Sequence, residues 1–110
     1  MIYELRSYNI DPALLDQYLA WANDGALPIL VGKFGFRMIG FWNAIAPSDG
    51  EVPETNVHWI IAWHTESEML DRWKEATSTD EWKAIGQGQP HFHLKAQRTL
   101  LQAIPRSPFQ

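Results

Sequence analysis

The chain has 110 residues, no cysteine and a net charge of −4, from 9 lysines and arginines against 13 aspartates and glutamates. This length allows one domain, and 45% apolar residues against 20% charged residues exclude a disordered chain. The absence of cysteine excludes disulfides and thiolate chemistry, and the acidic balance argues against nucleic-acid binding.

Apolar periodicity predicts six main elements in the order strand, helix, strand, strand, helix, strand. Their expected ranges are 2–10, 11–22, 36–46, 57–64, 65–77 and 95–103. Asp11 and Pro12 are typical of a helix start, because Asp accepts from free backbone amides and Pro has no amide to lose. Residues 23–25 end or interrupt the first helix, and a further turn is expected at 27–31. Residues 65–68 form a capping box for the second helix.

The strand at 57–64 is expected at the centre of the sheet, because neither of its faces is strongly polar. A second capping pattern at 78–81 indicates a short helix, and a Gly- and Pro-containing loop follows it. We expect a single domain over residues 1–104 and a C-terminal tail over 105–110.

This element order is that of the ferredoxin-like fold, an α+β domain with a four-stranded antiparallel sheet and two main helices on one face. The other sheet face is rich in aliphatic and aromatic side chains and must be covered. A second copy of the chain is the simplest cover. Six tryptophans in so short a chain also indicate a second buried surface, so we predict a homodimer.

Several segments resemble domains of the NIPSNAP family. Residues 2–8 resemble the family's opening strand, and residues 27–29 followed by 40–42 resemble its Leu-Pro segment before a Gly-Phe-Trp strand. Residues 80–82 resemble its short Asp-Pro-Glu-Trp helix start. The resemblance implies a dimeric α+β barrel, in which two ferredoxin-like sheets face each other. Relatives of that architecture include cofactor-free monooxygenases, small isomerases and lyases, and haem-dependent enzymes, whereas the NIPSNAP family itself has no well-established chemistry.

Charged residues on the first strand give one candidate site. Glu4 and Arg6 share a strand face, and the ferredoxin-like order places that strand between the third and last strands. We expect His58 or His64 to approach this row from the third strand and Arg98 from the last. Arg6 would then clamp an anion, and His58 would act as a base whose tautomer Glu4 sets. The alternative is a buried Glu4–Arg6 ion pair that fixes the register of the barrel or dimer.

Whether His58 joins this row depends on which face of the sheet its side chain occupies. It lies one residue from the position of a histidine in the NIPSNAP third strand, and a one-residue offset on a strand changes the face. His91 and His93 form a His-x-His pair without a third ligand at metal-site spacing, so we predict no metal. They follow a loop, so we expect them to meet water and to matter less than His58.

Aromatic residues give a second hypothesis, a pocket for a small hydrophobic or aromatic ligand. Cofactor-free monooxygenases of this architecture hold such a substrate in an apolar pocket and let the substrate itself react with oxygen. The candidate walls are Tyr3, Phe36, Trp42, Trp59 and Trp63. The alternative is ordinary packing of the core and of the dimer.

The sequence therefore predicts a NIPSNAP-like homodimer that binds or transforms a small hydrophobic or aromatic metabolite without a cofactor. The alternative is a non-catalytic module for ligand binding or protein interaction, and the residues leave open whether the protein is an enzyme. The catalytic candidates are Arg6 and His58, and the ligand-binding candidates are Tyr3, Glu4, Trp42, Trp59 and Arg98. The N-terminus lacks the apolar core of a signal peptide and no stretch approaches the roughly 20 apolar residues of a membrane span, so we expect a cytoplasmic protein without a membrane partner.

Overall fold

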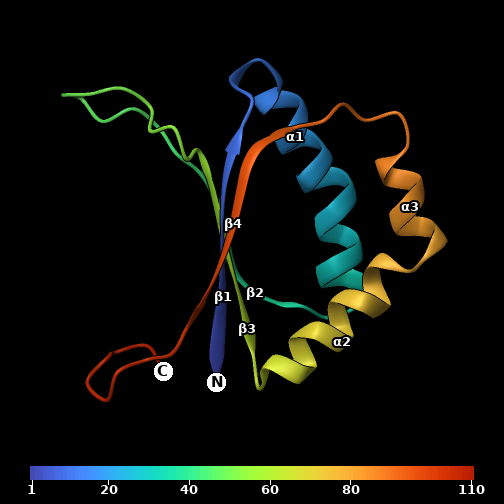
Figure 1. The fold of residues 1–110 in the computed structure, drawn as a ribbon, viewed down its shortest axis with the longest axis vertical. Coiled ribbons are helices and arrows are strands. Elements are labelled where there is room, and N and C mark those ends of the chain that lie inside the picture. Colours follow the sequence, from blue (N-terminus) through green and yellow to red (C-terminus); the bar gives the residue numbers. More distant parts are fainter.

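Four strands form one antiparallel sheet, and the helices cover one of its faces (Figure 1). The computed structural model describes residues 1–110. The strand order is β2–β3–β1–β4, so β1 and β3 occupy the centre, as predicted. The bounds are β1 Ile2–Ile10, α1 Leu15–Trp21, β2 Arg37–Asn43, β3 Val57–Trp63, α2 Glu66–Thr77, α3 Asp80–Gly86 and β4 His93–Leu101. The α+β ferredoxin-like fold predicted from the sequence is confirmed.

The first helical segment is longer than predicted. After a 3-10 turn at Pro12–Leu14 and the α-helix α1, wide π turns continue through Ala22–Ala26 and Pro28–Lys33. The expected break at 23–25 is therefore a widening of the helix. Gly25 faces Ile85 of α3 at this point, where an added β-carbon would make an ordinary contact at 3.7 Å.

The predicted helix starts are fixed by threonine side chains. The Thr65 hydroxyl accepts from the backbone N–H of Glu68 at 3.0 Å, and α2 begins at the next residue. The Thr79 hydroxyl accepts from the Trp82 N–H at 3.2 Å at the start of α3. Acidic residues follow each cap, where their negative charges interact favourably with the positive end of the helix dipole.

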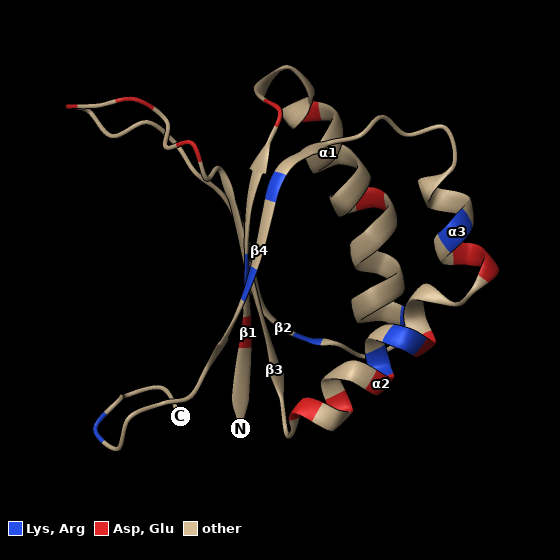
Figure 2. Ribbon diagram, in the orientation of Figure 1, with Lys and Arg blue, Asp and Glu red and all other residues tan.

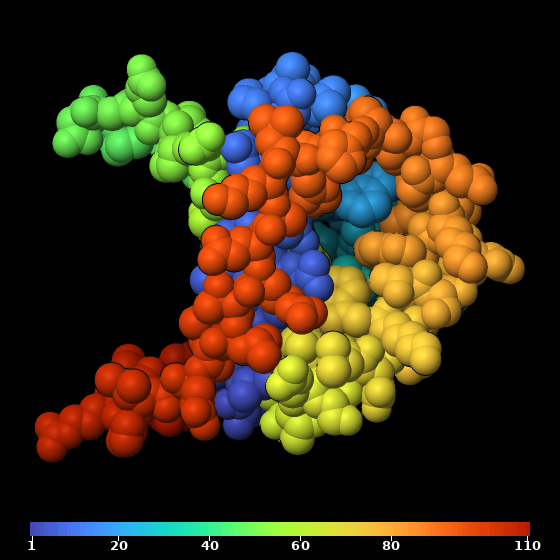
Figure 3. Space-filling model, in the orientation of Figure 1, coloured from blue at the N-terminus to red at the C-terminus, as the bar shows by residue number.

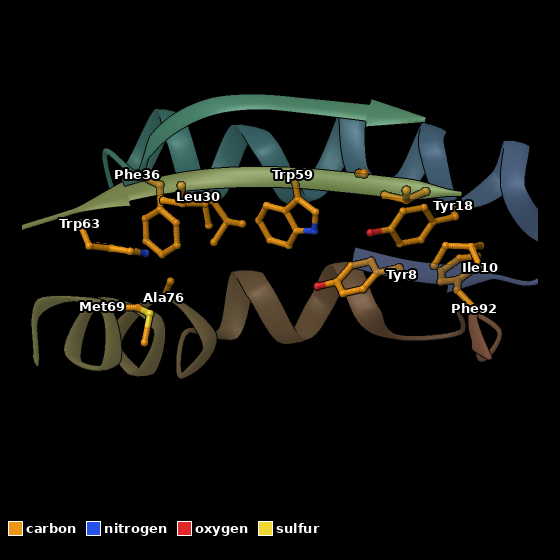
Figure 4. Close-up of a cluster of buried hydrophobic side chains, with 13 residues drawn as sticks. Tyr8, Ile10, Tyr18, Leu30, Phe36, Trp59, Trp63, Met69, Ala76 and Phe92 are labelled. Atoms are coloured by element: carbon orange, nitrogen blue, oxygen red, sulfur yellow. The ribbon is translucent and has the colours of Figure 1, made fainter. Parts of the chain in front are cut away.

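The sheet has two faces, which we call the helix face and the open face. Arg6 pairs with Trp59 and Ser7 pairs with His58 across β1 and β3, so Arg6 and Trp59 share the helix face while His58 lies on the open face. The core lies between the helix face and the helices, and it contains 13 buried residues (Figure 4). No helix combines the length and the apolarity that crossing a bilayer would require.

Both edge strands contain an irregularity that changes which side chains face the core. In β2 the register shifts between Met38 and Gly40, so Met38 and Phe41 both pack on the helix face, and Trp42 lies on the open face. Simple alternation placed Met38 and Trp42 on one face, and that placement is wrong because a bulge resets the alternation. β4 contains a similar shift opposite Asn9 and Ile10.

A buried asparagine attaches the long β2–β3 connection to β1. The Asn56 side chain accepts from the Ile10 N–H at 2.9 Å and donates to the Ile10 carbonyl at 2.8 Å. The backbone N–H of Asn56 donates to the Tyr8 carbonyl at 2.9 Å. Asn56 thereby replaces ladder hydrogen bonds at the end of the strand, where β3 begins.

Candidate functional site

A buried carboxylate lies at the centre of the helix face. Glu4 is fully buried, and its Oε2 atom accepts from Arg6 Nε at 2.9 Å. Its Oε1 atom accepts from Trp63 Nε1 at 3.0 Å and from Trp73 Nε1 at 2.9 Å. Both oxygens are therefore engaged, and the hydrogen bonds hold an otherwise costly buried charge in place. The Glu4–Arg6 ion pair that the sequence left open as an alternative is present.

Arg6 continues from this ion pair toward a row of aromatic rings. Its Nη1 donates to the Tyr8 hydroxyl at 3.2 Å, and its Cζ atom lies 4.5 Å from the ring centroid of Trp73 and 5.5 Å from that of Trp59. Burial alone would lower the pKa of Arg6, but Tyr8 and Glu4 outweigh it and raise the pKa above its ordinary value. The guanidinium is therefore a permanent, oriented cation.

A cavity of about 140 Å³ adjoins Arg6, between the sheet and the helices. An apolar protein cavity of about 150 Å³ holds one benzene molecule, so this volume suits a single aromatic ring. Figure 3 shows the molecule hollowed between β4 and the helices α2 and α3, with the region of α1 visible in the hollow. The cavity is lined by Arg6, Tyr8, Tyr18, Trp21, Ala22, Ala26, Leu27, Leu30, Phe41, Trp59, Trp73, Trp82 and His93.

Three polar groups converge within this aromatic lining. Figure 4 shows the hydroxyls of Tyr8 and Tyr18 and the indole nitrogen of Trp59 pointing toward a common region. Trp59 Nε1 is buried and makes no hydrogen bond of good geometry, although the indole lies near enough to the Tyr8 hydroxyl to lower the pKa of that phenol. Burial raises the pKa of Tyr18, and the neighbouring Tyr8 raises it further. Burial also raises the pKa of Tyr8, against the lowering effects of Arg6 and of the Trp59 indole, so both phenols stay protonated at neutral pH.

His93 adds an imidazole to the wall of the cavity. Its ring centroid lies 4.5 Å from that of Tyr8 and 5.6 Å from that of Tyr18. Burial lowers the pKa of His93, and the positive charges of His91 and Arg6 lower it further. The imidazole is consequently neutral at pH 7 and able to accept a proton.

His91 is exposed, as expected, but His93 is only partly exposed, because its ring packs against Tyr8 and Tyr18. The strand begins at His93, two residues before its predicted start, and the register shift pairs His93 with Ile10 on the helix face. A bulge of this kind leaves no signal in the alternation pattern. Of the other lining residues that were missed, Tyr8 and Phe41 lie on β1 and β2, and the rest come from the helical segments, whose inward faces the pattern marked only as core.

The predicted site residues divide between the two faces of the sheet. Glu4, Arg6 and Trp59 lie on the helix face, and Arg98 pairs with Arg6 on the same face. The others lie on the open face: the Ser7 hydroxyl is 3.2 Å from His58 Nδ1, Tyr3 packs against Phe109 with ring centroids 5.5 Å apart, and Trp42 pairs with His58. Because the sheet separates them, His58 does not join the Glu4–Arg6 row within one chain.

The sheet order and the helices on one face define a ferredoxin-like α+β domain. The solved structure of an antibiotic biosynthesis monooxygenase superposes with a TM-score of 0.58 at 11% identity, covering 96% of this chain and all of that one. The sequence profile of the NIPSNAP family matches residues 3–108, and the chain belongs to that family. The resemblance found in the sequence is therefore confirmed.

Solved NIPSNAP proteins share the whole fold. An uncharacterised NIPSNAP domain protein from Burkholderia xenovorans has a TM-score of 0.78 at 18% identity, covering 98% of this chain and 99% of that one. A NIPSNAP family protein from Agrobacterium tumefaciens has a TM-score of 0.81 at 17% identity, covering 99% and 98%. No curated protein matches the sequence. At these identities the likeness concerns the fold, and the function has to be argued from the cavity.

Proposed function

We propose that this NIPSNAP protein binds a small aromatic molecule bearing an oxygen atom in the cavity between the sheet and the helices. The observation that carries the proposal is the buried Nε1–H of Trp59, which makes no hydrogen bond of good geometry, at a cavity whose lining is mostly apolar. A buried donor without a partner costs about 1–3 kcal/mol. A ligand oxygen that accepts from Trp59 removes this cost, while the ring of the ligand contacts the surrounding indoles.

His93 gives the proposed site a proton acceptor. A neutral imidazole accepts a proton from a phenolic or enolic hydroxyl of the ligand, and the anion so formed is stabilised by the Arg6 guanidinium and the Trp59 N–H. The likeness to an antibiotic biosynthesis monooxygenase favours a reaction of that anion with oxygen. Residues of the helix face carry this chemistry, and His58 on the open face does not.

We also propose that the open face mediates a homodimer. This face carries no helix, and Ile39, Trp42 and Leu101 are 43%, 49% and 39% exposed. The β2–β3 loop and the C-terminal tail both extend on this side of the sheet (Figure 1). Sedimentation at micromolar concentration is expected to give twice the chain mass of 12.7 kDa, and a clean monomer would contradict the proposal.

Binding of phenol and benzene tests the cavity and the Trp59 donor separately. Trp59→Phe keeps an aromatic ring and removes the N–H, so we expect about three- to tenfold weaker phenol binding, the value of one hydrogen bond, and unchanged benzene binding. Ala26→Leu places extra volume in the cavity wall and is expected to abolish both, whereas Ala20→Leu, at an exposed position of the same helical segment, leaves both unchanged. Calorimetry or ligand-observed NMR measures each affinity, and equal phenol binding by all four proteins would refute the proposed site.

Oxygen uptake distinguishes catalysis from binding alone. With hydroquinone as substrate, transfer of two electrons and two protons to O2 gives benzoquinone and hydrogen peroxide. We expect uptake above the buffer rate for the wild type and a loss of that excess in His93→Gln. Uptake at the buffer rate, with phenol binding intact, would support the non-catalytic ligand-binding module instead.

A further inference from the structure

Two arginines face each other across β1 and β4, and one of them, Arg6, also lines the cavity. Arg6 and Arg98 are directly opposed in the β1–β4 pairing, on the helix face. Like charges directly opposite in a sheet are destabilising. Figure 2 shows basic segments of β1 and β4 beside each other near the middle of the sheet, while the acidic residues lie mostly on the helices and loops. A nearby negative charge would stabilise an opposed cationic pair of this kind.

The chain itself supplies only one such charge. Glu4 is the single acidic residue of the two strands, and both of its oxygens are engaged by Arg6 and the two indoles. The three ion pairs of the protein leave Arg98 without a carboxylate partner. Counting −1 for Glu4 and +1 for each arginine leaves the cluster with a net charge of +1.

This charge lies next to the aromatic cavity. Arg6, Arg98, Tyr8, Ala96 and Gln97 line a cleft of about 250 Å³, and Arg6 and Tyr8 are also walls of the cavity. The cavity and the cleft therefore adjoin each other at Arg6 and Tyr8. The planar forks of two guanidinium groups match the two oxygens of a carboxylate.

We propose that the ligand is a small aromatic carboxylic acid, with its ring in the cavity and its carboxylate between Arg6 and Arg98. This inference rests on the proposed function and specifies its substrate class. A monoanion balances the local charge of +1, whereas a phosphate dianion would exceed it. Arg98 thus acts as a specificity residue: it selects the acid over neutral aromatic molecules of the same shape.

The test compares 4-hydroxybenzoate with its neutral analogue 4-hydroxybenzamide, with phenol and with phenyl phosphate. Calorimetry is run on the wild type and on two variants that each remove one cation from β4. Arg98→Met removes the proposed anion ligand at an exposed position where folding is preserved, and Lys95→Met is the matched control because Lys95 pairs with Asn9 on the open face. Circular dichroism verifies that both variants are folded.

We expect the wild type to bind 4-hydroxybenzoate about three- to tenfold more tightly than the amide, since a partly exposed ion pair is worth about 1 kcal/mol. Arg98→Met should remove this preference, Lys95→Met should keep it, and phenol should bind all three proteins equally. The preference should also fall at high salt. Phenol binding without a preference for the acid, or tighter binding of phenyl phosphate, would overturn this inference and leave the proposed function intact. Failure of every aromatic probe to bind would overturn both.

Discussion

Replacement of Glu4 by Gln tests the buried centre of the site. The substitution keeps the shape of the side chain but removes the charge that three donors share, from Arg6, Trp63 and Trp73. It also places an amide N–H₂ where one of these donors points. Breaking a buried ion pair by removing one partner costs about 3–5 kcal/mol. Because the Arg6 side chain is 23% exposed, water recovers part of that loss, and we expect about 2–4 kcal/mol.

Urea unfolding followed by tryptophan fluorescence measures this loss, because two of the indoles donate to Glu4. At about 4 °C per kcal/mol for a domain of this size, the melting temperature should fall by about 8–16 °C. Glu75→Gln, at an exposed position of α2, is the matched control and is expected to stay within about 0.5 kcal/mol of the wild type. In Glu4→Gln/Arg6→Met the uncompensated cation is gone, so part of the stability should return. A Glu4→Gln protein as stable as the control would refute the assignment of Glu4 as a structural counterion.

Four further substitutions test separate parts of the structure. Gly32→Ala is expected to raise the free energy of unfolding by about 0.4–1 kcal/mol, because the added methyl meets no atom within 4 Å. Gly40→Ala would place a β-carbon 2.2 Å from the Trp42 ring. This substitution should displace the indole from the open face and weaken self-association in sedimentation. Asn56→Ala removes two buried hydrogen bonds to a strand end and should cost about 2–3 kcal/mol in denaturant unfolding. His93 has a pKa below its unfolded value of about 6.5, so its contribution to stability is complete above that pH and lost as the pH falls through the lower folded value. Unfolding free energies between pH 7 and 5 should therefore fall less in His93→Phe than in the wild type, and parallel profiles would contradict the partly buried, neutral imidazole.

Periodicity and capping were sufficient to predict the fold. The alternation in β1 and β3, together with hydroxyl caps such as Thr65, defines elements whose order permits few topologies. These signals are local, and each agrees with the tertiary arrangement. The start of α2 was predictable because its cap requires only residues that are adjacent in sequence.

The candidate site was predicted only in part, because the residues that meet there depend on the pairing register between neighbouring strands. The grouping of Glu4 with Arg6 follows from alternation along one strand, and Arg98 was expected to approach them from the last strand. Whether His58 joins them depends on which residue of β3 lies opposite Arg6, and that pairing has no local signature. His93 depends on a bulge in β4, so neither its face nor its burial followed from the pattern.

β1 connects the two surfaces that the proposals assign to different roles. It is a central strand, so its side chains alternate between the aromatic cavity and the open face, and neighbouring residues belong to different surfaces. Arg6 and Tyr8 line the cavity, while Tyr3 and Ser7 lie on the face proposed for the dimer. Because the strand is fixed on both sides by hydrogen-bonded neighbours, a partner chain that shifted β1 would also move the Arg6 guanidinium relative to Arg98. Self-association and ligand affinity are therefore expected to be linked, so the dimer dissociation constant from sedimentation should change when the aromatic acid is added, and an unchanged constant would contradict this coupling.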